Sequence, residues 1–334
     1  MKALVALAAG LVAGVAAEQL AVRKPWRDDP TKDEPFGSVR GEPHWLRADD
    51  GTELYVEVHP ADHPGAPTIV MGHGYCLNQD SWHFQRKALR GEANLVLWDQ
   101  RGHGRSERGP AQNNTIDQLG RDLQWVINGF TDGPVTVVGH SMGGMTIMAL
   151  AAQFPETIAE RFAGVGFVAT SSGQLSGDFL GLPAPIAGLA QDAIAGASPG
   201  RVRTGPWVQR VRYTDLNFAV TKHVSFGPGA PNSLNQFTVQ MLNGTSMDTA
   251  VDFLPTLLAH DKSEALKRFH GVPALVVCGD VDVLTPPSHS RRIVQALPDA
   301  ALSVLPGTGH MIQLERAEQI TEGIRRLAFT DRDA

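Results

Sequence analysis

Short apolar runs separated by helical patterns make up most of the chain after residue 60. Runs without interspersed charges are typical of strands that are buried on both faces of a sheet. They occur at residues 68–71, 94–98, 135–138, 165–169, 274–278 and 301–305. Helical patterns occur at residues 115–130, 142–154 and 288–297. Strands that alternate with helices predict a mostly parallel sheet built from right-handed crossovers.

The segment before these runs has a different pattern. Residues 44–48 and 52–59 alternate polar and apolar positions around Asp49-Asp50-Gly51, which predicts an antiparallel hairpin. Residues 23–43 are rich in Pro, Asp, Lys and Gly and have no apolar period, so we expect a linker there. The folded domain is therefore expected to begin near residue 44.

One interval breaks the alternation of strands and helices. The chain between Ala169 and Ala274 is far longer than a crossover helix requires, and long inserts in compact domains are usually functional lids. We therefore expect a core at residues 44–170 and 271–330, with a helical lid at 171–270 after the sixth strand. The large apolar residues of the lid predict either an apolar substrate site or a core of the lid itself. They are Phe179, Leu180, Leu182, Trp207, Phe218, Phe226 and Phe237.

Composition and charge limit the function. The chain has 334 residues, of which 42% are hydrophobic and 19% charged, as in a globular protein with a large core. A net charge of -6 supplies no basic field for a polyanion, so we expect no nucleic-acid partner.

The first 22 residues contain the only indication of location. An uncharged run at 3–17 follows Lys2 and ends in small residues before Glu18, as in a secretory signal, but basic residues follow the run rather than precede it. A cleaved signal, a membrane anchor and a helix docked on the domain all remain open. We predict an exported or membrane-associated protein with membrane contact through residues 3–17, and a cytoplasmic protein as the alternative.

The sequence Gly139-His140-Ser141-Met142-Gly143 lies between an apolar run and a helical pattern. A serine hydroxyl becomes a nucleophile only when a base removes its proton and hydrogen-bond donors stabilise the oxyanion that forms. A strand before this pattern and a helix after it are the context of a nucleophile elbow, in which the glycines permit a tight turn. Ser141 is therefore the predicted nucleophile.

An oxyanion hole requires two backbone N–H groups, one of them from the residue after the nucleophile. Met142 is that residue. The second donor is expected from His73-Gly74-Tyr75, after the run 68–71, and Tyr75 is the predicted N–H donor. We interpret His73 as a residue that positions this loop rather than as a metal ligand or a second base.

The base and its carboxylate partner are expected later in the chain. His310 ends the glycine-rich loop Pro306-Gly307-Thr308-Gly309-His310 after the last apolar run and is the predicted base. Asp282 is the predicted carboxylate, and the nearby Asp280 is expected to brace the turn. Residues 170–173 contain no acid, which excludes an orienting carboxylate there.

These motifs together resemble the α/β-hydrolase superfamily, in the branch of cap-bearing esterases and monoacylglycerol lipases. The resemblance extends over roughly residues 44–328 and implies an eight-stranded sheet whose first strands are antiparallel. It also implies that the loop 99–106 has a structural role. The matching motifs are His73-Gly74, Asp99-Gln100-Arg101-Gly102-His103-Gly104-Arg105-Ser106, Gly139-His140-Ser141-Met142-Gly143-Gly144, Gly279 to Pro286 and Gly309-His310.

The predicted activity is hydrolysis of a carboxylic ester or related acyl bond through an acyl-Ser141 intermediate. We expect no metal and no cofactor, and a small acyl ester, including lipid-like esters, as the substrate. The same three residues also serve hydrolysis of C–C or amide bonds and perhydrolysis, and these stay open. Two alternatives outside catalysis are a small-molecule binding protein with little turnover and a membrane-tethered scaffold.

Overall fold

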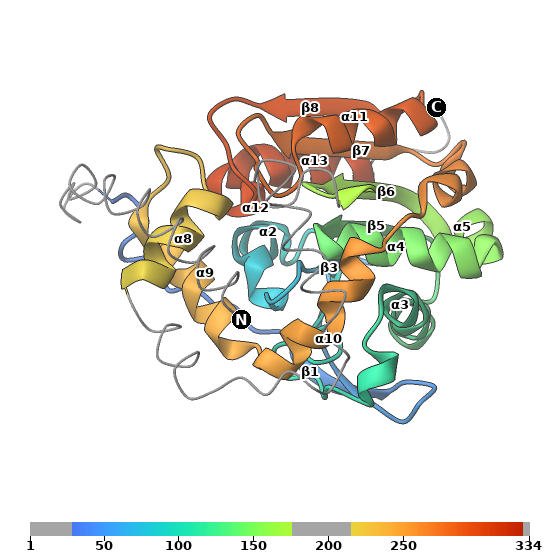
Figure 1. Cartoon of the computed structure of the whole chain (residues 1–334). Helices are drawn as coiled ribbons and strands as arrows, with labels where there is room; N and C mark the ends of the chain where they lie inside the picture. Colours follow the sequence, from blue (N-terminus) through green and yellow to red (C-terminus); the bar gives the residue numbers. More distant parts are fainter. Residues whose placement is uncertain (1–28, 176–214, 330–334) are drawn as a thin grey trace.

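The computed structural model describes residues 29–175 and 215–329 (Figure 1). Its central sheet has eight strands in the order β1-β2-β4-β3-β5-β6-β7-β8. β1 pairs with β2 and β2 with β4 in antiparallel orientation, and every other pairing is parallel. The predicted fold, a mostly parallel eight-stranded sheet with antiparallel first strands, is confirmed. The strands are β1 (Glu42–Arg47), β2 (Glu53–His59), β3 (Thr68–Gly72), β4 (Asn94–Trp98), β5 (Val135–His140), β6 (Phe162–Val168), β7 (Ala274–Gly279) and β8 (Ala301–Leu305).

Helices cover both faces of the sheet because successive side chains of a strand point to opposite faces. In β3, Val70 packs into one apolar cluster, whereas Ile69 and Met71 pack into another. The first cluster includes residues of α3 (Ile116–Phe130), α4 (Met142–Gln153), α5 (Pro155–Arg161), η6 (Ser263–Phe269) and α11 (Pro287–Ala296). The second includes residues of α2 (His83–Leu89), α12 (Ile312–Glu315) and α13 (Ala317–Phe329). Two buried layers therefore hold the parallel strands, as their apolar runs predict.

Three further helices lie between β6 and β7 in the chain and form the described part of the lid. They are α8 (Asp215–Ser225), α9 (Asn232–Gly244) and α10 (Met247–Leu258), drawn together in yellow and orange in Figure 1. The apolar pattern over 233–259 corresponds to two helices, because the chain leaves α9 at Thr245 and begins α10 at Ser246. The Ser246 side chain accepts a hydrogen bond from the N–H of Thr249 at 3.0 Å, which caps the new helix.

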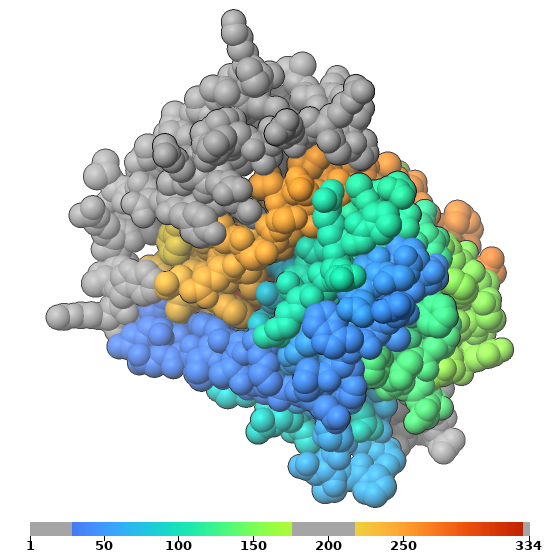
Figure 2. All heavy atoms as spheres, turned by 90° about the horizontal axis from the view of Figure 1, so that it is seen from below, coloured from blue at the N-terminus to red at the C-terminus, as the bar shows by residue number. Residues whose placement is uncertain are grey.

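The segment before β1 contacts both the lid and the core. Asp29 accepts hydrogen bonds from the N–H and the hydroxyl of Ser233 in α9, both at 2.8 Å. Phe36 stacks on Phe237 of α9 with ring centroids 4.6 Å apart. Figure 2 shows this segment in blue beside the yellow and orange lid. The strand β1 begins at Glu42, inside the range expected for a linker.

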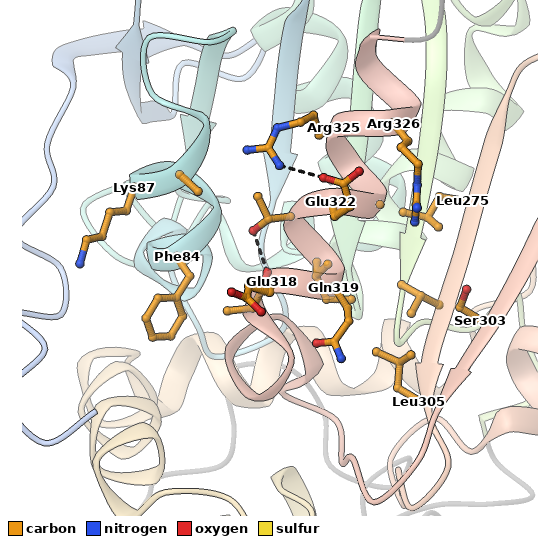
Figure 3. Close-up of a pocket in the computed structure, with 16 residues that line it drawn as sticks. Phe84, Lys87, Leu275, Ser303, Leu305, Glu318, Gln319, Glu322, Arg325 and Arg326 are labelled. Carbon is orange, nitrogen blue, oxygen red and sulfur yellow. Dashed lines mark hydrogen bonds and ion pairs between the residues drawn. The ribbon is translucent and has the colours of Figure 1, made fainter. Parts of the chain in front are cut away.

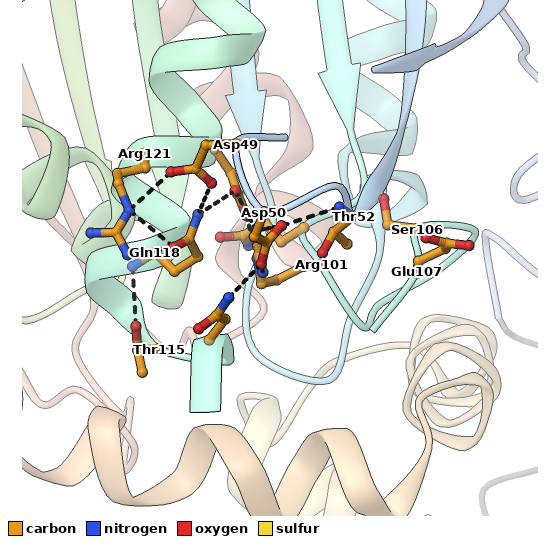
Figure 4. Close-up of polar contacts among 12 residues, drawn as sticks. Asp49, Asp50, Thr52, Arg101, Ser106, Glu107, Thr115, Gln118 and Arg121 are labelled. Atoms are coloured by element: carbon orange, nitrogen blue, oxygen red, sulfur yellow. Dashed lines mark hydrogen bonds and ion pairs between the residues drawn. The ribbon is translucent and has the colours of Figure 1, made fainter. Parts of the chain in front are cut away.

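Buried charged residues hold the loop after β4. The 3-10 helices η2 (Gln79–Trp82) and η3 (Ala111–Asn113) lie near this loop. The Arg101 guanidinium donates to Asp122 at 2.6 Å. It also donates to Asp50 at 2.7 Å, and both Arg101 and Asp50 are labelled in Figure 4. Burial alone would raise the pKa of Asp50, but hydrogen bonds from Arg101, Asn113 and Thr52 hold it far below its ordinary value. Asp99 accepts hydrogen bonds from the N–H groups of Gln79 and Arg105. The Arg101 and Asp99 side chains thus bind other residues of the fold. This is consistent with the structural role of the loop 99–106 that the resemblance implies.

The prediction of location requires a correction. Across residues 29–175 and 215–329, no helix is both long enough and apolar enough to pass through a membrane. The apolar run at 3–17, on which the prediction of export or membrane association rested, lies outside the described residues. We therefore withdraw that prediction, together with the predicted membrane contact.

Candidate active site

Ser141 lies at the turn between β5 and α4, where the backbone takes an unusual conformation. Its φ of 52° and ψ of -117° are rare for any residue other than glycine. The glycines two residues away on each side permit the turn. A Cβ at Gly139 would lie 2.3 Å from the carbonyl carbon of Gly143, and one at Gly143 would lie 2.3 Å from the oxygen of Gly72. Strand, turn and helix therefore meet here as the sequence predicts.

Neighbouring strands hold this strained turn in place. The N–H of Ser141 donates to the carbonyl of Val168 at 2.9 Å, at the end of β6. The hydroxyl of Thr170 donates to the carbonyl of Ser141 at 2.6 Å. Strained backbone persists only where its surroundings determine it, and it is frequent at functional sites.

His310 and Asp282 come together from two loops at the carboxyl end of the sheet. Nδ1 of His310 lies 2.8 Å from Oδ2 of Asp282. Both residues are buried, with 6% and 3% of their surfaces exposed. The Asp282 carboxylate also accepts hydrogen bonds from the N–H groups of Leu284 and Thr285 at 2.8 and 2.9 Å. Because the carboxylate accepts these hydrogen bonds and the Nδ1–H of His310, its orientation is fixed.

Asp280, the other candidate acid, has a different environment. It is exposed, and its carboxylate accepts a hydrogen bond from the N–H of Thr308 at 3.2 Å. This contact joins the turn after β7 to the loop that carries His310. Asp280 therefore braces the neighbouring loop, whereas Asp282 contacts the imidazole.

A cavity of about 370 Å³ brings Ser141 and His310 to one surface. Both residues line it, and so do Tyr75 and His140. Among the described residues, no Asp, Glu, Lys or Arg lines this cavity. Its apolar lining comes mainly from the lid and from the loops after β3, β7 and β8: Leu77, Val224, Leu242, Leu254, Leu257, Leu258, Leu284 and Met311. The cavity therefore suits a small, uncharged, apolar group next to the Ser141 hydroxyl.

The large apolar residues predicted to shape the lid differ in where they lie. Phe226 and Phe237 are buried in a cluster with Leu77 and Met311, so they form a core that joins the lid to the loops near Ser141. Phe218 is half-buried in α8. Phe179, Leu180, Leu182 and Trp207 lie outside the described residues.

The predicted oxyanion donors occupy two different elements. Met142 is the first residue of α4, so its N–H is among those that have no acceptor within the helix. Tyr75 lies in the loop after β3, beside the same cavity. His73 is fully buried, and burial holds its pKa well below the ordinary value, which keeps the ring neutral. Its Nε2 accepts from the N–H of Gln100 at 2.9 Å, so its Nδ1–H donates to the carbonyl of Gly74 at 2.8 Å.

This contact has a consequence for Tyr75. The carbonyl of Gly74 and the N–H of Tyr75 belong to one trans peptide unit and point in opposite directions. By binding the carbonyl, His73 determines the direction of the N–H. The interpretation of His73 as a residue that positions the loop is consistent with these contacts.

Sequence reasoning missed three residues that hold the candidate base. The hydroxyl of Thr285 donates to Asp282 at 2.9 Å, and Nε2 of His140 lies 3.0 Å from the carbonyl of His310. Burial holds the pKa of His140 well below its ordinary value, so this neutral ring donates from Nε2. The carboxylate of Glu315 accepts from the N–H of Gly309 at 2.8 Å. Thr285 and Glu315 follow Asp282 and His310 closely in the sequence, and this proximity was the available signal.

A larger cavity of about 870 Å³ lies elsewhere, along α2, α13 and the strands β7 and β8 (Figure 3). Charged side chains such as Lys87, Glu318 and Arg325 line it together with Phe84 and Leu305. Ser141, Asp282 and His310 do not belong to it. The smaller cavity is therefore the candidate active site, and within the described ranges no cluster of three or more His, Cys, Asp or Glu residues is arranged to hold a metal ion.

The comparisons with known proteins agree with this architecture. A family model described as alpha/beta hydrolase fold matches residues 67–317. A solved esterase, EaEST from Exiguobacterium antarcticum, superposes with a TM-score of 0.69 at 21% identity and covers 86% of this chain and 99% of its own. At this identity, the likeness shows the fold alone.

Two relatives with a described activity align with the chain over a smaller share of their own length. One is the dihydrolipoyllysine-residue acetyltransferase component of an acetoin cleaving system from Pseudomonas putida, 27% identical over 267 residues, which are 79% of this chain and 64% of the relative. The chain thus spans less than two thirds of that relative. The other is the sn-1-specific diacylglycerol lipase ABHD11 of Mus musculus, 24% identical over 263 residues, which are 77% of this chain and 80% of the relative.

Proposed function

The chain belongs to the α/β-hydrolase family, and we propose on this premise that it is a serine hydrolase that cleaves carboxylic esters through an acyl intermediate on Ser141. The observation that supports this most is the position of His310. Its Nδ1 lies 2.8 Å from Asp282, while its ring lines the cavity that also contains Ser141. A base that is held by a carboxylate and lines the same cavity as a serine hydroxyl supports acyl transfer, because the reaction needs these three groups together.

The proposed reaction has two similar halves. Nε2 of His310 takes the proton of the Ser141 hydroxyl as its oxygen attacks the ester carbonyl carbon. The N–H groups of Tyr75 and Met142 stabilise the oxyanion, and the C–O bond to the leaving alcohol then breaks as His310 returns the proton to it. Water repeats the sequence on the acyl-Ser141 ester and releases the acid. Asp282 holds the tautomer of His310 and stabilises its cation without taking the proton.

The cavity lining supports a substrate class. Burial of a charged acyl group against Leu254, Leu257 and Leu258 would remove it from water without a partner, which is costly. An uncharged alkyl group gains about 0.8 kcal/mol for each CH₂ that it buries. We therefore propose uncharged, apolar esters as substrates, and a volume of about 370 Å³ favours small ones.

A fluorophosphonate probe tests the proposal directly. We expect stoichiometric labelling of Ser141 at neutral pH and its loss in Ser141→Ala. The exposed Ser288 provides a matched control, and Ser288→Ala should label like the unmodified protein. Absence of an adduct on Ser141 in the unmodified protein would refute the proposal.

The substrate class has a separate test. A series of p-nitrophenyl esters from acetate to octanoate should show kcat/KM rising with chain length until the cavity is filled. An ester with a terminal carboxylate should be a poor substrate. Equal rates for charged and uncharged esters of the same length would contradict the argument from the lining while leaving the serine hydrolase proposal intact.

A further inference from the structure

The lid contacts the loop that carries a predicted oxyanion donor. The hydroxyl of Tyr75 donates a hydrogen bond to the carbonyl of Ala250 in α10. At the next residue, the carbonyl of Cys76 accepts from the hydroxyl of Thr245 at 3.1 Å. Cys76 has a φ of 57°, so the backbone leaves the extended conformation of β3 at this residue. The loop therefore does not continue the hydrogen bonding of the sheet. Two consecutive residues of the loop are therefore bound to the lid.

The helix α10 is itself fixed to the core. Asp252 accepts from Nε of Arg108 and from the amide of Asn114, both at 2.8 Å. The N–H of Ile116 donates to the hydroxyl of Thr256 at 3.2 Å. Asp252 and Thr256 are one turn apart, so both can face the core from the same side of the helix. These contacts anchor α10 beside the candidate site.

The core side of this contact is also packed closely. A Cβ added to Gly102 would lie 2.7 Å from Cγ2 of Thr249, so α10 approaches the loop after β4 as near as its backbone permits. The ring of Phe253 lies 5.5 Å from that of His103, and the ring of His103 lies 6.3 Å from that of Tyr75. The side chain of Tyr75 therefore contacts α10 and His103. Its backbone N–H belongs to the peptide unit whose carbonyl His73 binds.

We propose that the lid positions the oxyanion hole, with the Tyr75 hydroxyl and the Thr245 hydroxyl as the two connections between the lid and the donor loop. This inference rests on the proposed acyl transfer at Ser141. Removal of one oxyanion donor typically lowers kcat by about 10²–10³. Loss of a connection loosens the donor without removing it, so a smaller loss is expected. The lid then contributes to the chemical step as well as to the shape of the cavity.

Kinetics of Tyr75→Phe test the first connection. The variant keeps the ring and the N–H and removes only the hydroxyl. With p-nitrophenyl butyrate we expect kcat to fall about tenfold, which is about 1.4 kcal/mol, while KM changes little. Affinity for a trifluoromethyl ketone, whose adduct with Ser141 places an oxyanion in the hole, should fall by the same factor. Thr245→Val should act in the same direction.

Tyr55 provides the matched control. It is buried in β2, and its hydroxyl donates to Glu57 at 2.9 Å, away from the cavity. Tyr55→Phe therefore loses one buried hydrogen bond but should keep kcat and the inhibitor affinity. If Tyr75→Phe behaves like Tyr55→Phe, or if it raises KM and leaves kcat unchanged, the lid does not position the oxyanion hole.

Amide hydrogen exchange separates this inference from the proposed function. In Tyr75→Phe and in Thr245→Val, the amides of residues 74–77 should exchange faster, while those of β5 stay protected. Unchanged exchange in both variants would overturn the inference whatever the activity. Faster exchange in a protein that fluorophosphonate does not label would support the connection between lid and loop and refute acyl transfer at Ser141.

Discussion

Buried histidines make the stability of this protein sensitive to acid. His59, His103 and His260 are 3%, 0% and 4% exposed, and burial lowers the pKa of each to about 4 from an ordinary value of 6.5. His73 and His140 are also fully buried with a lowered pKa. In the unfolded chain, all of these rings take up a proton near their ordinary pKa. A fall in pH therefore favours unfolding.

The sign and size of the change in the free energy of unfolding follow from proton linkage. Between pH 4 and pH 6.5 the unfolded chain binds more protons than the folded one, so the free energy of unfolding rises with pH in this window. The contribution is present above pH 6.5 and is lost as the pH falls toward 4. At pH 5, each of the three histidines with a pKa of about 4 has lost roughly 2 kcal/mol.

Asp99 opposes this loss in part. Burial raises its pKa to about 6, so between pH 3.8 and pH 6 it is the folded state that binds the extra proton. Lowering the pH from 8 to 5 therefore stabilises the folded state by roughly 1 kcal/mol through Asp99. Together, these three histidines and Asp99 lose about 5 kcal/mol between pH 8 and pH 5, which is comparable with the whole stability of many domains.

Urea unfolding at pH 8 and pH 5, followed by the fluorescence of the buried Trp82 and Trp98, measures this loss. His260→Gln removes one titrating ring and should reduce the difference between the two pH values by about 2 kcal/mol. His63 is exposed, so His63→Gln should leave the difference unchanged. Equal free energies of unfolding at pH 8 and pH 5 would refute the argument from burial.

Three further predictions concern the candidate site. Asp282→Asn should lower kcat by about 10⁴ because it presents the wrong tautomer of His310, whereas Asp280→Asn should keep most activity; equal effects on kcat would contradict the assignment. Glu315→Ala leaves the N–H of Gly309 without its acceptor and should lower the free energy of unfolding by about 1–3 kcal/mol, as thermal unfolding would show. Leu257→Trp fills the cavity and should shift preference among p-nitrophenyl esters toward acetate; an unchanged profile would exclude Leu257 from the acyl site.

The sheet was largely predictable because strands buried on both faces need continuous apolar runs. Residues 94–98 coincide with the mostly buried strand β4. Residues 301–305 coincide with β8, although this edge strand is exposed or partly buried along its length. The strand β6 begins at Phe162, earlier than the predicted 165, because α5 runs directly into it and Gly164 interrupts the apolar pattern. In the lid, one apolar period covers both α9 and α10, and the break between them depends on a single capping residue, Ser246.

Local patterns could not predict which residues surround the candidate site. The segment before β1 has the composition of a linker, yet Asp29 binds Ser233 because the fold brings these distant residues together. Among the lid's apolar residues, Phe226 and Phe237 belong to its core, whereas Leu254 and Leu257 line the cavity. Hydrophobicity alone does not distinguish these two positions.

What the amino-acid sequence determined by itself is the sheet and the turn at Ser141, since apolar runs and flanking glycines act over a few residues. It also places His310 and Asp282 on loops after neighbouring strands. The sequence also favoured Asp282 over Asp280 as the partner of His310. Only the tertiary structure decided that Thr285 and the N–H of Leu284 hold this carboxylate and that the Tyr75 hydroxyl reaches Ala250. The contact between Tyr75 and Ala250 joins residues far apart in the chain, so it depends on how the lid and the sheet pack and on no pattern within either segment.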